Sequence, residues 1–162
     1  MAGAAAAGAS NMSRIYLVLL GLNALWFGAA FRYFGLTPET AAKLLVPKSA
    51  RDSPILRTLS ASMPFLGGMN LAFAVLALLL LFNHELFPDA RQKALFAVVF
   101  AVAHAGQLAG NLAVARRGGR QGEAYWPVLH GPMLFIFVVD GMLAAANLLV
   151  AIGLCVDPGF VR

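Results

Sequence analysis

The sequence predicts an all-α membrane protein, an antiparallel bundle of four transmembrane helices, and three observations lead to this fold. Of the 162 residues, 60% are hydrophobic and only 12% are charged, which is too apolar for an ordinary soluble domain. The apolar residues gather in four runs, each near or above the ~20 residues that cross a bilayer as a helix. No alternating ten-residue pattern indicates a membrane β-barrel.

Each apolar run is expected to form one span, because backbone polar groups in lipid must be satisfied within the segment. The four spans are expected at about residues 15–34, 59–82, 94–115 and 128–156. Before them, the Ala-rich residues 1–14 lack the basic start and distinct apolar core of a signal peptide, so a flexible leader is expected. Residues 157–162 are expected to form a short tail.

The first loop is the longest and is expected to contain a short interfacial helix. Pro38 and Glu39 are typical of a first helical turn, and Pro47 would end the helix. Leu44, Leu45 and Val46 are then expected to face the headgroups. The second loop is expected to form a compact turn. The third loop combines glycines, which allow tight turning, with aromatic residues that favour the membrane interface.

The basic residues predict the orientation, because cationic loops stay on the cytoplasmic or equivalent face. One side of the bundle is expected to hold eight of them: Arg32, Lys43, Lys48, Arg51, Arg57, Arg116, Arg117 and Arg120. The other side holds four: Arg14, Arg91, Lys93 and Arg162. Both termini are therefore expected on the less basic side, extracytoplasmic or lumenal. The net charge of +5 belongs to helix ends and loops, so nucleic acid is not expected as a partner.

Each span carries a hydrogen-bonding residue close to its midpoint: Asn23, Asn70, His104 and Asp140. These side chains can satisfy one another only if all four point into the bundle. Gln107 lies one turn from His104 on the same helical stripe. The sequence therefore predicts a polar layer, with two interpretations open. It is either a set of interhelical hydrogen bonds that fix the packing, or a proton or ligand site.

Asp140 is the most informative of these residues, because an ionised carboxylate at the bilayer centre costs about 2.5 to 3.5 kcal/mol on insertion scales. His104 is its expected partner. Haem ligation by His104 would require a second axial ligand, but His84 and His130 lie near span ends. The histidines and the single Cys155 have no metal-ligand spacing. No metal or other cofactor is therefore expected.

Small residues indicate where helices pack closely. Gly106 and Gly110 form a GxxxG pattern next to the polar stripe of the third span, which favours a close second helix. Gly67 and Gly68 are expected to allow close packing of the second span.

Three arginines lie at span ends on the more basic side: Arg32, Arg57 and Arg116. Snorkelling toward the interface is the simpler interpretation of their position. Binding of a lipid phosphate is the alternative.

Two segments resemble the small four-helix DoxX-like membrane proteins. Residues 54–79, PILRTLSASMPFLGGMNLAFAVLALL, place an arginine at the entry of a span with a Gly-Gly pair. Residues 110–122, GNLAVARRGGRQG, leave the third span in a basic glycine turn. The likeness covers most of residues 15–155. A weaker likeness is to the four-helix scaffold protein of ergosterol biosynthesis. These resemblances imply the four-helix fold, and tethering or a place in a quinone-linked enzyme, but no catalytic residue.

Three functions follow as hypotheses. The favoured one is an accessory or scaffold subunit for other membrane proteins or lipids, because no catalytic motif is recognisable and small-residue faces abound. The second is a small proton- or cation-coupled transporter centred on Asp140. The third is a quinone- or sterol-related membrane enzyme subunit. Besides the bilayer, other membrane proteins or further copies of the chain are the expected partners, and enzymatic activity is the less expected outcome.

Overall fold

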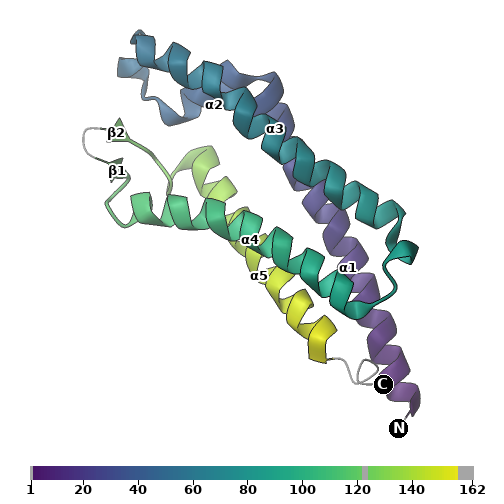
Figure 1. The fold of residues 1–162 in the computed structure, drawn as a ribbon. Coiled ribbons are helices and arrows are strands. Elements are labelled where there is room, and N and C mark those ends of the chain that lie inside the picture. The colour runs from purple at the N-terminus through teal and green to yellow at the C-terminus, as the bar shows by residue number, and fades with distance from the viewer. Residues whose placement is uncertain (1, 122–123, 157–162) are drawn as a thin grey trace.

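The described residues, 2–121 and 124–156, form four long helices joined by short helical segments and turns, as the computed structural model shows (Figure 1). The long helices are α1 (Ala2–Phe31), α3 (Pro54–Phe82), α4 (Ala90–Ala115) and α5 (Gly131–Val156). Among the residues described, four segments are long and apolar enough to cross a bilayer: Asn11–Leu36, which continues from α1 to Leu36, and the whole of α3, α4 and α5. The predicted four-helix membrane bundle is confirmed.

Most helices begin before the expected spans, and local chemistry explains where. α1 begins at Ala2 and includes the expected leader, because residues 2–9 are mostly alanine, the strongest helix former. The expected tail lies outside the described residues. α3 begins at Pro54, where the Ser53 hydroxyl accepts a bond from the Ile55 amide at 3.3 Å. At α4, the Asp89 carboxylate likewise accepts from a first-turn amide at 2.8 Å.

The first loop contains the predicted short helix, α2 (Pro38–Leu45), which follows a π-helical turn, η1 (Arg32–Leu36). The guanidinium of Arg51 donates to the carbonyls of Lys43 at 2.8 Å and Val46 at 3.2 Å, and so satisfies the end of α2. Leu44 lines a cavity between the helix pairs, and its expected position toward the headgroups stays a prediction.

The remaining connections are short. The 3₁₀ turn η2 (Lys48–Ala50) precedes α3, and η3 (His84–Leu86) joins α3 to α4. Between α4 and α5, the strands β1 (Arg120–Gln121) and β2 (Ala124–Tyr125) pair antiparallel.

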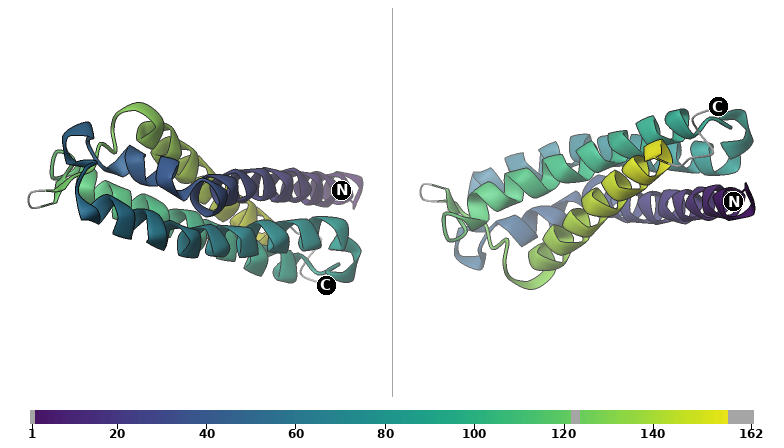
Figure 2. Two further views of the ribbon diagram at one scale, coloured as in Figure 1. Left: turned by 90° about the horizontal axis from the view of Figure 1, so that it is seen from above. Right: turned by 90° about the horizontal axis from the view of Figure 1, so that it is seen from below.

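The helices are organised as two pairs, α1 with α3 and α4 with α5. α1 also packs against α5, which connects the pairs. Near the chain ends the Met12 side chain reaches Gly153, so the start of α1 meets the end of α5. Figure 1 shows the pairs separating toward the end that holds α2 and the strands. Figure 2 shows the molecule from above and from below relative to Figure 1, and in both views α5 crosses the bundle obliquely.

The core consists of aromatic rings between helices and of small residues where helices approach. The Phe27 ring lies 5.1 Å from Phe73 and 6.2 Å from Phe100, measured between centroids, and joins α1, α3 and α4. A Cβ on Gly67 would collide with the backbone of Gly35, so these two glycines bring α3 against η1.

The outer surface of the helices is apolar, as contact with lipid requires. Large side chains such as Phe65, Leu95 and Met142 are well exposed along the spans. Gly106 and Gly110 also lie on this outer surface, where an added Cβ would meet nothing within 4 Å. The close helix approach expected at the GxxxG pattern is therefore not made by any described residue of the chain. Gly68 faces open space in the same way.

Candidate functional site

Four buried polar residues from three helices form one hydrogen-bond network in the interior: Asn23 from α1, His104 from α4, and Asp140 and Asn147 from α5. Each has at most 1% of its surface exposed. Together with the partly buried Trp26, they connect α1, α4 and α5 through side-chain bonds of 2.9 to 3.1 Å. The network therefore links both helix pairs at one level.

His104 occupies the centre of this network. Its Nδ1 lies 2.9 Å from Oδ1 of Asp140, and its Nε2 lies 2.9 Å from Oδ1 of Asn23. The Phe27 ring stacks on the imidazole, with centroids 4.6 Å apart and planes 20° apart. Both ring nitrogens and one ring face are thus engaged, so the imidazole has little freedom to turn.

The two asparagines fix their own orientations. The amide nitrogen of Asn147 donates to the carbonyl of Leu143 at 2.8 Å, which defines which end of that amide is the nitrogen. The same nitrogen donates to Oδ1 of Asn23 at 3.1 Å, and the Asn23 nitrogen donates back to Oδ1 of Asn147 at 3.0 Å. Oδ1 of Asn23 therefore faces His104, and it can only accept a hydrogen bond.

This orientation determines where the protons of the pair lie. Nε2 of His104 must carry a hydrogen, because it faces the acceptor oxygen of Asn23. One further proton is then required between Nδ1 of His104 and Oδ1 of Asp140, on either atom, for a hydrogen bond to form there. With that proton the pair is neutral overall, either as two uncharged groups or as an ion pair. A net charge in the interior is thereby avoided.

Asp140 also accepts a bond from Trp26, whose indole nitrogen lies 2.9 Å from Oδ1. The second carboxyl oxygen, Oδ2, is buried and receives no hydrogen bond from the residues that the structure describes. One oxygen therefore has two partners, whereas the other has none.

The structure brings three of the four predicted midplane residues together and leaves the fourth aside. Asn70 is buried, but its amide donates to the carbonyl of Leu66 in its own helix at 2.8 Å. The expectation that Asn70 would join the layer was therefore wrong, because a helix can satisfy an asparagine locally. Gln107 lies outside the network and lines a neighbouring cavity. Trp26 was missed, although its position three residues after Asn23 places it on the same stripe.

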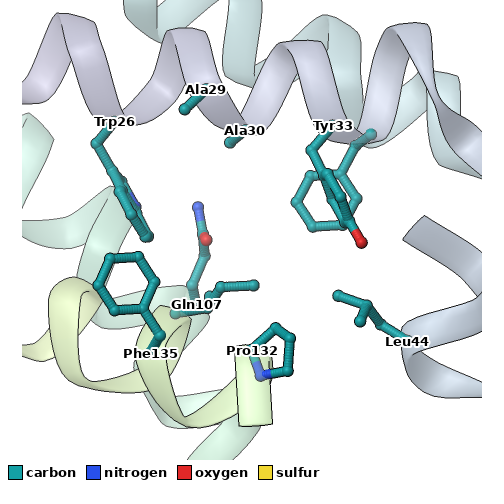
Figure 3. Close-up of a pocket in the computed structure, with 10 residues that line it drawn as sticks. Trp26, Ala29, Ala30, Tyr33, Leu44, Gln107, Pro132 and Phe135 are labelled. Carbon is teal, nitrogen blue, oxygen red and sulfur yellow. The ribbon is translucent and has the colours of Figure 1, made fainter. Parts of the chain in front are cut away.

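The cavity has a volume of about 330 Å³ and lies between the helix pairs (Figure 3). Its lining residues come from α1, η1, α2, α4 and α5: Trp26, Ala29, Ala30, Tyr33, Phe34, Leu44, Gln107, Pro132, Phe135 and Ile136. Figure 3 shows the amide of Gln107 between a wall with Trp26 and Phe135 and a wall with Tyr33 and Leu44. Trp26 thus belongs both to the cavity wall and to the hydrogen-bond network.

The remaining predicted site residues lie apart from this centre. Arg32, Arg57 and Arg116 are exposed, and none of their side chains makes a hydrogen bond or ion pair within the described part of the chain. Their binding to lipid phosphate stays a prediction. Within residues 2–121 and 124–156, no three His, Cys, Asp or Glu side chains are grouped as a metal site would require.

Comparison with family models, curated proteins and solved structures finds no match to this chain. The resemblance to DoxX-like proteins therefore stays a prediction. The fold and the network characterise a small multi-pass membrane protein with a buried His–Asp pair.

Proposed function

We propose that the protein is a small proton-coupled membrane carrier in which His104 and Asp140 together bind the proton. The observation that supports this function most is the contact between Nδ1 of His104 and Oδ1 of Asp140, which requires one proton. The pair lies in the interior of a bundle with four candidate membrane spans. Ionisable residues inside a membrane are typical of proton pathways.

Packing alone is a weaker explanation for Asp140. Inserting an aspartate at the centre of a span costs about 2.5 to 3.5 kcal/mol. Its two hydrogen bonds, from Trp26 and with His104, return about 0.6 kcal/mol each, the average for interhelical bonds in membranes. An asparagine would connect the helices at a smaller cost. The carboxyl group is therefore better explained by its ability to exchange a proton.

Loss of the proton would change how the helices pack. Because Asn23 holds the hydrogen of His104 on Nε2, the deprotonated pair would direct the lone pair of Nδ1 at the Asp140 carboxylate across 2.9 Å. That contact would become repulsive, and it lies between α4 and α5. Binding and release of one proton would therefore favour two different packings of these helices, which is what a carrier requires.

Nitrogen NMR of protein labelled in histidine tests the proton site. In nanodiscs, with His84 and His130 replaced by glutamine, the pH is varied over the range in which the protein stays folded, and the Nδ1 signal of His104 is expected to change whereas Nε2 keeps its hydrogen. Asp140→Asn is expected to abolish this response. Asp52→Asn, the same chemical change at an exposed loop residue, is the matched control. An imidazole that keeps one state over this range would contradict the proton function and favour a packing role.

Transport itself is measured in proteoliposomes that contain a trapped pH-sensitive dye. With a membrane potential imposed by potassium and valinomycin, wild type and Asp52→Asn are expected to admit protons faster than protein-free vesicles. Asp140→Asn is expected to match the protein-free rate. Equal rates for wild type and Asp140→Asn would refute proton transfer through this pair.

A second candidate function is that of an accessory subunit, which the outward glycines of α4 favour. Gly106 and Gly110 leave open space where a helix of another protein, or of a second copy, would fit closely. This function is tested by measuring the native mass of wild type and of Gly106→Leu in mild detergent. A complex that Gly106→Leu dissociates would support it, and a monomer in both would argue against it.

A further inference from the structure

We infer that the cavity between the helix pairs binds a small, uncharged molecule that consists of a flat ring system and one hydrogen-bonding group. The cavity of about 330 Å³ is at the lower end of the volumes typical of small-molecule sites. Its wall Trp26 contacts Asp140, but binding depends on the lining residues alone. This inference can therefore hold or fail separately from the proton function.

Aromatic rings on two sides favour a flat occupant. Trp26 and Phe135 form an edge-to-face pair with centroids 5.7 Å apart and planes at 65°. Tyr33 and Phe34 form a second such pair, at 5.7 Å and 83°. Both pairs line the cavity, and Figure 3 shows Trp26 and Phe135 on the side opposite Tyr33. A planar ring can meet the faces or edges of such rings at favourable distances.

One polar group is available to a molecule in the cavity. The amide of Gln107 points into the space, and no described residue forms a hydrogen bond with it. The hydroxyl of Tyr33 is oriented instead toward the carbonyl of Thr40, at 3.4 Å. Because an amide both donates and accepts, Gln107 can pair with a hydroxyl or with a carbonyl of the ligand.

The charge and size of the site exclude other classes of ligand. None of the ten lining residues is charged, and the nearby Asp140 and His104 contact each other, with Trp26 bonded to Asp140. A charged molecule would therefore be desolvated without a partner. A two-chain phospholipid is too large for this volume. A single alkyl chain would fit, but it would leave the Gln107 amide without a hydrogen bond.

Calorimetric titration in nanodiscs, with empty nanodiscs as the blank, distinguishes these occupants. The probes are 2-naphthol, which has a ring and a hydroxyl, 1-decanol, which has a chain and a hydroxyl, and 2-naphthalenesulfonate, a charged ring. Saturable binding is expected for 2-naphthol only. Ala30→Leu fills the cavity and is expected to abolish binding, whereas Ala105→Leu adds the same volume on the exposed face of α4 and is expected to change nothing.

Gln107→Leu tests the polar contact, since it keeps the size of the side chain. Loss of one hydrogen bond is expected to weaken 2-naphthol binding about three- to ten-fold. An unchanged affinity would overturn the role of Gln107. Preferred binding of 1-decanol would identify the cavity as a chain site, and absence of saturable binding of every probe would overturn the inference.

Discussion

Replacing Asn23 by leucine is expected to destabilise the bundle by about 2 kcal/mol. Asn23 takes part in three interhelical hydrogen bonds, two with Asn147 and one with His104. At about 0.6 kcal/mol each, the average for interhelical bonds in membrane proteins, their loss amounts to about 2 kcal/mol. The loss rises toward 4 kcal/mol if the buried groups left on His104 and Asn147 find no other partner, since each such group costs about 1 to 3 kcal/mol.

The assay is reversible unfolding in mixed micelles of a mild detergent and sodium dodecyl sulfate, followed by circular dichroism. Asn70→Leu is a matched control, because Asn70 is also a buried asparagine but bonds only to the carbonyl of Leu66 in its own helix. This control is expected to stay within about 0.5 kcal/mol of wild type, since no bond between helices is lost.

Two outcomes would refute the reasoning about Asn23. A destabilisation below about 0.5 kcal/mol would mean that the network contributes no interhelical stability. Equal effects of Asn23→Leu and Asn70→Leu would mean that burial of the asparagine, and not its bonds to other helices, determines the cost. A larger loss for Asn23→Leu than for Asn70→Leu is the only result that agrees with the structure.

Two further predictions concern the region around α2 and α3. Gly67→Ala is expected to lower the free energy of unfolding by about 1 to 3 kcal/mol, because the added Cβ would collide with the backbone of Gly35. Gly68 faces open space, so Gly68→Ala should leave the stability nearly unchanged. Unfolding of both variants in detergent compares them. The hydrogen bond from Lys43, together with its charge, lowers the pKa of the Glu39 carboxyl. The contribution of this ion pair to the stability of α2 is present above the ordinary pKa of glutamate and is lost as the pH falls through the lowered pKa. In that pH range, hydrogen exchange of the α2 amides should accelerate beyond its intrinsic change in wild type but not in Glu39→Gln.

The sequence predicted most of the fold and about half of the site, for identifiable reasons. Length and hydropathy are properties of each span alone, so the four helices could be recognised without knowing their neighbours. The depth of Asn23, His104 and Asp140 placed them in one layer. Depth does not specify the direction of a side chain, however, and Asn70 at a similar depth bonds within its own helix. Trp26 escaped notice because an indole in an apolar run is ordinary, and only its contact with Asp140 distinguishes it.

The polar network also indicates which part of the bundle can move. α1, α4 and α5 are connected by side-chain hydrogen bonds. Among the described residues, α3 forms no such bond with another helix, and it is held by apolar contacts such as that between Phe27 and Phe73. The contact that depends on the proton, between His104 and Asp140, lies within the α4–α5 pair, and the bonds of these two residues to Asn23 and Trp26 connect it to α1. A change in protonation would therefore act first on the packing of α4 against α5. Through the bonds to α1 it would then act on the boundary between the two helix pairs, where the cavity lies, and α3 would follow α1. Such relative motion of the two pairs would change the shape of the cavity while leaving the packing within α1–α3 intact.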